Sequence, residues 1–343
     1  MSGRGQKHVG PRRRATSYDV AELAGVSQSA VSRVFQRGAS ASKAMRARVL
    51  EAAEQLGYRP NAIARGLITQ RSNMVAVVIG RQTNLFYPEV LVQLTEQFSQ
   101  RDIRVLLFTL AQERDIDLVV EQMLQYRVDG ILMAAMLNQS QVEVFRSANI
   151  PLVLFNRAFE AALTSSVRCD QAEGERWLVQ SLHAAGHRRF AIISGPEDSS
   201  VSAERTQGAL AQLHDLGVDE VTVLSGDYSY ASGKAAVHTL LQNGARYDVV
   251  IAANDAMAIG CIDAARGKFG LSVPDELSVV GFDGIGPARF DAYNLTTVRQ
   301  PIGRMTAAAA EMLVHRIEDP EMLPEHRVFS GEHVLGSSAR IQR

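Results

Sequence analysis

The chain has 343 residues, of which 46% are hydrophobic and 21% are charged, as in soluble globular proteins of two or three domains. Its net charge of −1 hides an asymmetry: residues 1–71 carry 13 Lys and Arg against 4 Asp and Glu, and the remainder carries 23 against 33. Only two cysteines, Cys169 and Cys261, are present, and no apolar stretch reaches 18 residues, which argues against a disulfide framework and a membrane span.

A basic head on an acidic body indicates that the head binds a polyanion, whereas the alternative is a merely solvated arm. Residues 1–15 are rich in Gly, Arg and Lys, and we expect a disordered basic tail that adds nonspecific attraction to phosphates or remains uninvolved. No apolar run follows these basic residues, so the sequence predicts no secretory signal and a cytoplasmic location with reduced, buried cysteines.

Residues 16–59 contain two short apolar-periodic segments that meet at Ala24-Gly25-Val26-Ser27. Gly25 tolerates the positive φ of a sharp corner, and Ser27 can cap the following helix. The residues expected to form a small core are Val20, Leu23, Ala24, Val26, Val31 and Val34. Gln28, Ser29 and Arg33 then lie on the outer face of the second helix. This pattern predicts a helix-turn-helix of the kind that enters a DNA major groove, and an ordinary helical hairpin is the alternative.

A third helix is expected near 43–56, capped by Ser40 or Ser42 and ended by Gly57. Residues 60–71 follow as a linker in which Asn61 can cap a helix of only about two turns. Such a helix is marginal alone because nucleation is costly, and Gly66 costs it about 1 kcal/mol relative to Ala. We therefore expect this segment to be helical only when a partner chain and DNA support it.

From Met74 onward the pattern alternates between buried strands and amphipathic helices. The apolar runs are Met74–Ile79, Val105–Phe108, Gly130–Ala134, Leu152–Phe155, Phe190–Ile193, Val221–Leu224, Val249–Ala252 and Leu277–Val280. The helical segments lie near 87–100, 114–126, 171–185, 203–215, 231–242, 255–267 and 302–318. Since eight strands exceed one convenient sheet, residues 72–343 are expected to form two doubly wound α/β lobes with a cleft between them.

Ligands of open α/β sheets bind beyond the carboxyl ends of the strands. The residues that follow four of the apolar runs are Asn156-Arg157, Gly195-Pro196, Asn254-Asp255 and Phe282-Asp283, so several polar groups are expected to converge there. The planar fork of Arg205 can clamp a carboxylate or adjacent sugar hydroxyls. Each residue also has a plain alternative, because an arginine at a helix start is often a surface residue and a strand-end aspartate often only caps a helix.

Five pieces of the head keep a characteristic order and spacing. They are Tyr18-Asp19-Val20-Ala21, Ala24-Gly25-Val26-Ser27, Val31-Ser32-Arg33-Val34, Arg48-Val49-Leu50 and Leu56-Gly57-Tyr58-Arg59-Pro60-Asn61. Together they resemble the headpiece of the lac repressor family of bacterial transcription regulators, although Ala41 and Met45 stand where that family more often has Val and Thr. The resemblance implies a sensor domain like periplasmic sugar-binding proteins, with crossings between its lobes near 157–165, 283–292 and 320–325.

The resemblance also implies how the head binds DNA. Gln28, Ser29 and Arg33 would contact base edges, while the DNA-binding set continues with Ser17, Tyr18, Ser27, Ser32, Asn61 and Arg65. Leu67 would wedge apart a base step in the minor groove, where a buried core leucine is the plain alternative. Two headpieces related by a dyad imply double-stranded DNA with a pseudo-palindromic operator. We expect a homodimer, because no heptads precede Arg343 that would zip dimers into a tetramer.

In the sensor domain the resemblance implies a small effector, such as a sugar, a sugar acid or another metabolite. Arg205 and Asp283 would contact it, although Gly284 stands where the family often has a second acid. Tyr228 falls at an aromatic platform of some members, and Gln300 lies near a crossing between lobes. The rest of the expected effector set is Phe86, Tyr87, Asn156, Arg157 and Asn254.

Enzymatic functions find little support in the motifs. The sequence contains no Gly-x-Ser-x-Gly elbow, His-Glu-x-x-His, phosphate loop or Rossmann glycine fingerprint. His183 and His187 have no third metal ligand, so we expect neither metal nor cofactor, and His187 is expected to be a cation at a helix C-terminus. A sugar carrier that does not bind DNA is the remaining rival, and the basic head argues against it. The sequence thus predicts a dimeric DNA-binding regulator, expected to be a repressor, controlled by an effector.

Overall fold

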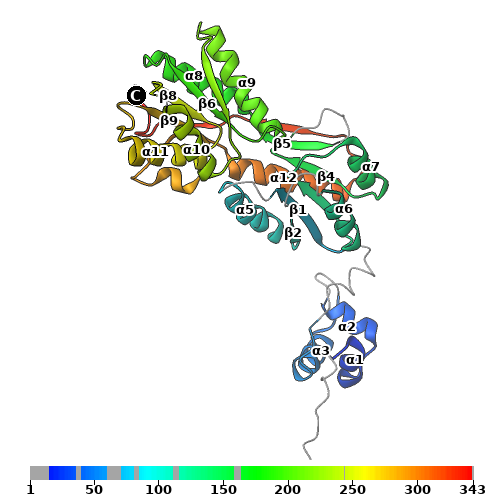
Figure 1. Cartoon of the computed structure of the whole chain (residues 1–343). Helices are drawn as coiled ribbons and strands as arrows, with labels where there is room; N and C mark the ends of the chain where they lie inside the picture. The colour runs from blue at the N-terminus through cyan, green and yellow to red at the C-terminus, as the bar shows by residue number, and fades with distance from the viewer. Residues whose placement is uncertain are drawn as a thin grey trace, which may run out of the picture. The chain divides into compact units, whose positions relative to one another are not determined.

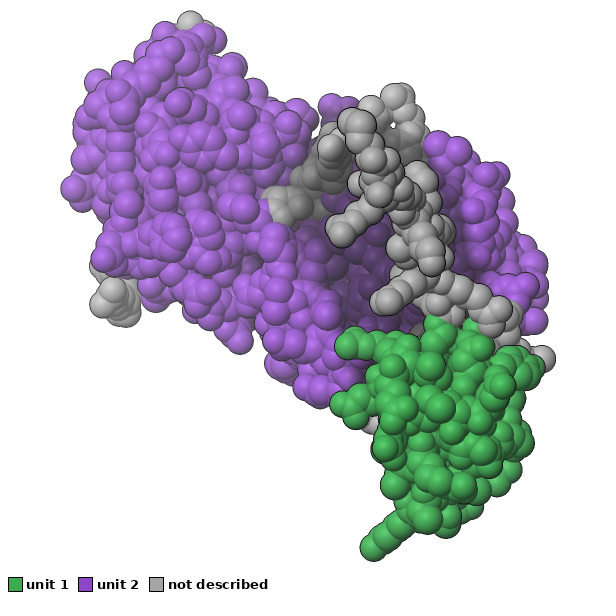
Figure 2. All heavy atoms as spheres, turned by 90° about the horizontal axis from the view of Figure 1, so that it is seen from below, with its two compact units in different colours: residues 1–72 green, residues 73–343 purple. Residues whose placement is uncertain are grey.

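The computed structural model describes residues 15–35, 40–59, 71–80, 85–110, 116–157, 164–242 and 244–341. The chain divides into two compact units, residues 1–72 and residues 73–343 (Figure 2). Most of the expected basic tail and the linker residues Asn61, Arg65 and Leu67 lie outside the described residues, so their roles stay predictions.

Unit 1 is a three-helix headpiece made of α1 (Ser17–Ala24), α2 (Gln28–Phe35) and α3 (Lys43–Gln55) (Figure 1). Thr16 and Asp19 form a reciprocal capping box at the start of α1. Gly25 has φ 62°, and its N–H donates to carbonyls of the last turn, so α1 stops at a left-handed residue. The Ser27 hydroxyl then accepts a hydrogen bond from Ala30 N at 3.2 Å and caps α2.

Apolar side chains from all three helices close the headpiece core. Val20, Val31 and Val49 are fully buried at its centre, whereas Leu23, expected in this core, is 51% exposed. The physical reason is helical phase: Leu23 lies about 200° around α1 from the buried Ala21, on the opposite side of the helix. Small alanines of α3 fill the space instead, and Ser42 caps that helix with a bond of 3.2 Å from Met45 N.

Unit 2 contains two six-stranded sheets, with strand orders β11-β5-β4-β3-β1-β2 and β12-β10-β9-β8-β6-β7. The strands of the first sheet are β1 (Met74–Gly80), β2 (Arg104–Leu110), β3 (Gly130–Met133), β4 (Leu152–Phe155), β5 (Ser165–Cys169) and β11 (His326–Phe329). Those of the second are β6 (Phe190–Ser194), β7 (Val221–Ser225), β8 (Val249–Ala252), β9 (Ser278–Asp283), β10 (Thr296–Arg299) and β12 (Glu332–Val334). Strand pairs are parallel except β10 with β12, so the strand ends that can bind ligands gather at one edge of each sheet.

Helices cover both sheets, as the doubly wound pattern predicts. The first lobe has α5 (Tyr87–Ser99), α6 (Ile116–Gln125) and α7 (Gln139–Ser147), and α12 (Ile302–Glu318) also packs on its strands (Figure 1). The second lobe has α8 (Gln171–Ala184), α9 (Ser200–Asp215), α10 (Tyr230–Leu241), α11 (Asp255–Phe269) and the 3-10 turn η2 (Gly286–Arg289). The expected fold class is therefore confirmed, and no helix in the described part of the chain could cross a membrane.

The passages between the lobes lie further along the chain than the sequence suggested. They were expected near 157–165, 283–292 and 320–325. However, β5 still belongs to the first sheet, so the chain leaves that sheet only after Cys169. Since β10 extends the second sheet to Arg299, the second passage follows it, and the third lies between Phe329 of β11 and Glu332 of β12. Short polar strands of this kind carry no apolar run that would reveal them.

His187 differs from its expected role as a cation at a helix end. Its side chain is buried between Leu182 O and Ser278 Oγ, each 2.9 Å from a ring nitrogen. Burial lowers the pKa of His187 below its ordinary value of 6.5. The neutral ring thus joins α8 to β9 in the core of the second lobe.

Candidate functional site

A small cavity lies between the two lobes at the carboxyl ends of their strands. Its volume is about 30 Å³, and the residues that line it are Phe86, Tyr87, Asn156, Arg157, Val201, Arg205, Tyr228, Asp283 and Gln300. Asn156 and Arg157 follow β4 of the first sheet, whereas Asp283 ends β9 of the second. Eight of the nine residues expected from the sequence as effector ligands therefore meet in one place.

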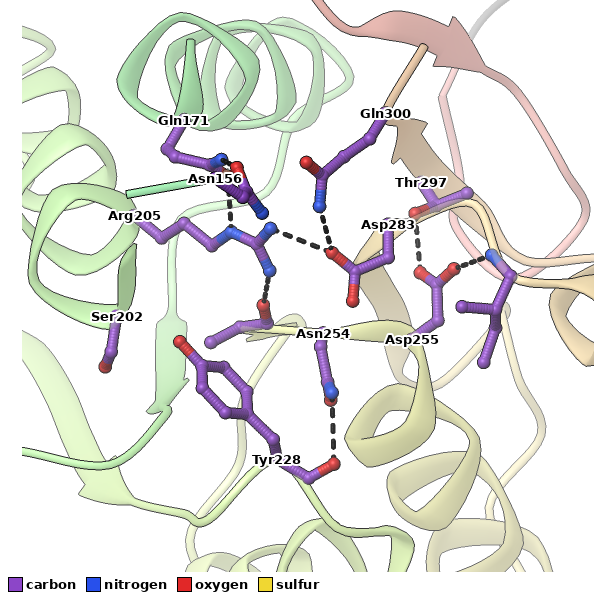
Figure 3. A network of polar contacts seen from close by, with 12 residues as sticks. Asn156, Gln171, Ser202, Arg205, Tyr228, Asn254, Asp255, Asp283, Thr297 and Gln300 are labelled. Atoms are coloured by element: carbon purple, nitrogen blue, oxygen red, sulfur yellow. Dashed lines mark hydrogen bonds and ion pairs between the residues drawn. The ribbon is translucent and has the colours of Figure 1, made fainter. Parts of the chain in front are cut away.

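A buried ion pair between Arg205 and Asp283 forms the floor of the cavity (Figure 3). Arg205 Nη2 lies 2.8 Å from Asp283 Oδ1, and both side chains are 3% exposed. The guanidinium also donates to the Ala253 carbonyl and stacks 3.8 Å above the Phe282 ring. Gln300 Nε2 donates to the same Asp283 oxygen at 2.8 Å. Burial is the largest single influence and opposes the charge of Arg205, but Asp283, Tyr228 and Glu175 together outweigh it, so the pKa of the guanidinium is raised.

A chain of hydrogen bonds runs from this ion pair to the first lobe. Arg205 Nε donates to Gln171 Oε1 at 2.8 Å, and Gln171 Nε2 donates to Asn156 Oδ1 at 2.9 Å. Figure 3 shows Gln171 at the start of α8, with its side chain bonded to Arg205 and to Asn156. Because Asn156 belongs to the first lobe and α9 to the second, these bonds connect the two walls of the cavity.

Tyr228 is held from two sides. Its hydroxyl lies 3.1 Å from Ser199 Oγ, and its carbonyl accepts a bond of 3.0 Å from Asn254 Nδ2. Gly195 makes room for the ring, since a Cβ at that position would come within 2.4 Å of it. Asn254 itself does not line the cavity: its Oδ1 caps α11 by accepting from Met257 N at 2.9 Å. Asn254, expected from the sequence as an effector ligand, thus holds the backbone of Tyr228 next to the cavity.

Three cavity residues have left-handed backbone conformations, namely Asn156 (φ 53°), Tyr228 (φ 66°) and Asp283 (φ 113°). Such conformations cost of order 1–3 kcal/mol each in residues other than glycine and cluster at ligand sites. The surrounding hydrogen bonds hold these residues in place, so the site is preorganised at the expense of stability.

Gly284, where the lac repressor family often has a second acid, has no room for a side chain here. A Cβ at Gly284 (φ 73°) would approach Arg299 Cα to 2.7 Å, so a larger residue would displace β10. A second, outer pocket of about 240 Å³ opens beside this glycine. Its lining includes Arg289, Arg299 and Arg304 together with Glu89, Glu332 and the shared residue Gln300.

Two buried carboxyl groups lie near the ion pair; Asp255 was noted after its strand but not expected as an effector ligand, and Glu175 was not noted at all. Asp255 accepts bonds from Thr297 Oγ1 at 2.5 Å and Ile285 N at 2.8 Å, and burial, followed by Asp283, raises its pKa to about 8. Glu175 on α8 is 1% exposed, and neither carboxyl oxygen has a hydrogen-bond partner among the described residues. Burial raises the pKa of Glu175 to about 8, so both groups favour the protonated form at neutral pH.

Sequence reasoning missed Gln171, Val201 and Glu175 as parts of the site and its surroundings. Gln171 follows β5, whose sequence Ser-Ser-Val-Arg-Cys is no apolar run, so a search of strand ends passed over it. The run Cys169-Asp170-Gln171 before an amphipathic helix was the available signal. Val201 and Glu175 lie on helices α9 and α8, and nothing in their local pattern distinguishes them from ordinary helix positions.

On the headpiece, the expected DNA-reading residues gather around the start of α2. Ser29, Ser32 and Arg33 are exposed, and Tyr18 on α1 is 72% exposed. Gln28 Nε2 donates to Ser17 Oγ at 3.3 Å, which joins the starts of α1 and α2. Ser27 Oγ lies 2.9 Å from Ser29 Oγ. The headpiece thus presents a polar face that its own core does not need.

No group of three or more His, Cys, Asp or Glu within the described ranges could hold a metal ion. The polar groups of the cavity are instead amide, guanidinium and carboxylate groups, which suit hydrogen bonding to a small organic molecule.

Comparison with known proteins places both units. Residues 16–61 match the model of bacterial regulatory proteins of the lacI family, and residues 179–339 match a periplasmic binding protein-like domain. Catabolite control protein A of Priestia megaterium is 33% identical over 303 residues, covering 87% of this chain and 91% of that protein. The ribose operon repressor of Escherichia coli (strain K12) is 32% identical over 316 residues, covering 90% and 94%.

Two solved structures also resemble this chain over nearly its whole length. A complex of the transcriptional regulator CelR with cellobiose is 30% identical, with a TM-score of 0.72 over 95% of this chain and 100% of that chain. The lac repressor dimer bound to operator and an anti-inducer has a TM-score of 0.86 over 95% of this chain and 99% of that chain; at 24% identity it supports the fold alone.

Proposed function

The chain belongs to the lacI family of bacterial regulatory proteins, and from this membership we propose how it converts the binding of a small molecule into a change of affinity for DNA. It is a sequence-specific DNA-binding transcriptional regulator, a repressor in our proposal. The observation that carries the proposal is the cavity, because residues expected from the sequence converge there from both lobes. A sugar or sugar derivative is the class of effector that its amide, guanidinium, carboxylate and aromatic groups suit.

Effector binding requires the lobes to move. A cavity of about 30 Å³ has room for about two water molecules, whereas sites for small molecules usually measure about 300 Å³ or more. The bond between Gln171 and Asn156 connects the walls across this space. An effector that inserts between the lobes breaks that bond and replaces it with its own, so it favours a different lobe arrangement. Differential affinity for the two arrangements is all that effector control requires.

We propose that the headpiece reads an operator through the exposed face of α2. Gln28, Ser29 and Arg33 reach base edges, while Ser17, Tyr18, Ser27 and Ser32 contact the phosphate backbone. Asn61, Arg65 and Leu67 extend the interface into the minor groove as a marginal helix that forms on DNA. Movement of the lobes changes the separation of the two linkers in a dimer and so stabilises or melts these helices.

A homodimer on a pseudo-palindromic operator completes the proposal. The edge strand β2 leaves Leu107 50% exposed, and Val92 on α5 and Leu118 on α6 are 59% and 65% exposed. Parallel sheets are normally covered on both faces, so these apolar side chains favour burial against a second copy. Because the function is to bind DNA, we place the protein in the cytoplasm, at the nucleoid, and we assign it no catalytic role.

The proposal is tested by selecting operator sites from genomic fragments and titrating the full-length protein at several salt concentrations. We expect tight, salt-dependent binding to a palindrome, and binding that is absent or insensitive to salt contradicts the proposal. Leu67→Ala should weaken specific operator binding while an effector still raises the melting temperature. Unchanged operator affinity in that variant would refute the wedge role of Leu67.

A further inference from the structure

The cavity holds a buried positive charge that its surroundings leave uncompensated. Arg157 is 6% exposed, and its Nη1 donates to the Asn156 carbonyl at 3.1 Å. Its Nε has no hydrogen-bond partner, and no carboxylate of the described segments lies within ion-pair distance of the guanidinium. The other cavity arginine, Arg205, is by contrast paired with Asp283. A buried, unpaired guanidinium is costly, so its retention in a cavity indicates a counter-ion that arrives with the ligand.

The same cavity also contains a buried acceptor without a donor. Gln300 is 1% exposed, and its Nε2 is fixed by the bond to Asp283, which leaves Oε1 without a partner in the described structure. Figure 3 shows that this oxygen points away from Asp283, toward the side of the cavity where Asn156 lies. A ligand that satisfies both groups carries an acceptor for Arg157, which the charge of the guanidinium favours as an anion, and an O–H or N–H donor for Gln300.

Neighbouring carboxyl groups do not supply the missing negative charge. The carboxyl of Asp255 is engaged by Thr297 and Ile285 on the far side of β9 (Figure 3). Glu175 forms no ion pair with either cavity arginine, and burial raises the pKa of Glu175 to about 8. Close to neutral pH the cavity therefore carries Arg157, Arg205 and Asp283 as its charges, an excess of one positive charge among the described residues.

The outer pocket extends this positive field toward solvent. Arg289, Arg299 and Arg304 outnumber Glu89 and Glu332 in its lining, and Arg299 lies 3.9 Å from Glu332. Gln300 lines both spaces, so the two lie on either side of a shared wall. Positive groups beside the cavity attract anions and raise their local concentration.

We propose that the effector is an anionic polyol, a small molecule whose carboxylate or phosphate pairs with Arg157 and whose hydroxyl group donates to Gln300. This inference rests on the proposed function, since it names the chemical class of the molecule that controls DNA binding. Arg157 then distinguishes acids from neutral sugars, because the planar guanidinium binds an anionic group with two directed hydrogen bonds.

The experiment compares matched acids and neutral sugars on the full-length protein. Glucose and galactose are titrated beside gluconate, galacturonate, glucose 6-phosphate and galactose 1-phosphate, with melting temperature and calorimetric affinity as readouts. We expect at least one acid to bind and its neutral counterpart not to bind at the same concentration. The carboxylates and phosphates separate the two sources of the anion. A neutral sugar that binds as tightly as its acid, or a set in which no acid binds, overturns the proposal.

The variant Arg157→Met tests the role of the charge directly. Its affinity for the acid should fall about 10- to 100-fold, while the melting temperature of the ligand-free protein should stay equal or rise, because an unpaired buried charge is removed. A purely structural arginine would show the reverse, a lower melting temperature with the acid response retained. Arg168→Gln is the matched control, because Arg168 pairs with Glu204 outside the cavity.

Binding to operator separates this inference from the proposed function. The control variant Arg168→Gln should bind operator DNA as the wild type does, since Arg168 lies outside both the headpiece and the cavity. If the wild type binds no operator, the proposed function fails, whatever acids bind to the sensor. If operator binding is intact and only neutral sugars change it, the anionic effector alone is wrong.

Discussion

The headpiece and the sensor unit place their functional groups in opposite environments. In the headpiece, the core is apolar and the polar residues proposed to read DNA lie outside it, where Ser29, Ser32 and Arg33 are exposed. In the sensor, the groups proposed to bind the effector are buried and hydrogen-bonded to one another. Function can therefore be removed from the headpiece without loss of stability, whereas the Arg205–Asp283 ion pair of the sensor contributes to both stability and the proposed binding.

The largest expected effect comes from breaking the buried ion pair. Asp283→Ala leaves Arg205 buried and unpaired, so we expect the free energy of unfolding of the sensor unit to fall by about 3–5 kcal/mol. Effector binding should be lost as well. Urea denaturation monitored by circular dichroism measures the first effect and calorimetry the second. The double variant Arg205→Met with Asp283→Leu should recover most of the stability but not the binding, and a double variant as unstable as the single one would contradict this account.

The second largest expected effect is a dependence of the sensor's stability on pH. The folded-state pKa of Glu175 is raised to about 8 from an ordinary value of 4.5, so between these pH values the folded state binds more protons than the unfolded state. Stability must then fall as pH rises through this window. Glu175→Gln should raise the melting temperature at pH 8.5 by several degrees and change it little at pH 4.5. Glu121→Gln on the exposed face of α6 is the control and should show no such dependence.

In the headpiece, by contrast, a substitution should lower the affinity for DNA without lowering stability. Arg33→Ala removes an exposed side chain, so the melting temperature of the variant should match that of the wild type. The free energy of operator binding should become less favourable by about 1–3 kcal/mol. Gel-shift titration against the selected operator measures the loss. Arg48→Ala on α3 is a matched loss of charge outside the proposed base-reading set. Equal losses for both variants would mean that Arg33 contributes only general attraction to phosphates.

The two units also differ in how much of each could be predicted from the sequence. The headpiece could be outlined in detail because capping residues and glycines act locally, as Ser27, Ser42 and Gly57 do; Leu23 was misplaced because helical phase depends on where a short helix begins. In the sensor, apolar runs located eight of the twelve described strands but not β5, β10, β11 and β12, whose short sequences contain polar residues.

The effector cavity shows the limit of prediction from strand ends. Arg157, Arg205 and Asp283 could be selected because they follow strands or match a family motif, and the structure brings them together. Whether Arg205 would be neutralised by Asp283 and Arg157 left unpaired depends on distances between segments remote in sequence. Asn254 illustrates the same point, since its position after β8 suited a ligand contact, yet its amide is used to hold Tyr228.

The smallest expected effects come from two glycine-to-alanine substitutions, one that strains the backbone of the headpiece and one that causes a steric collision in the sensor. Gly25 has φ 62°, and nothing lies within 4 Å of a Cβ built there. Gly25→Ala should therefore destabilise the headpiece only through its left-handed backbone, by about 1–2 kcal/mol. In the sensor, a Cβ at Gly195 would lie 2.4 Å from the Tyr228 ring, so Gly195→Ala must displace the ring and weaken effector binding.

Thermal melts with and without effector measure both variants: Gly25→Ala should leave the effector-induced shift of the sensor intact, and Gly195→Ala should reduce it. If Gly195→Ala left that shift unchanged, Tyr228 would not form a wall of the effector site.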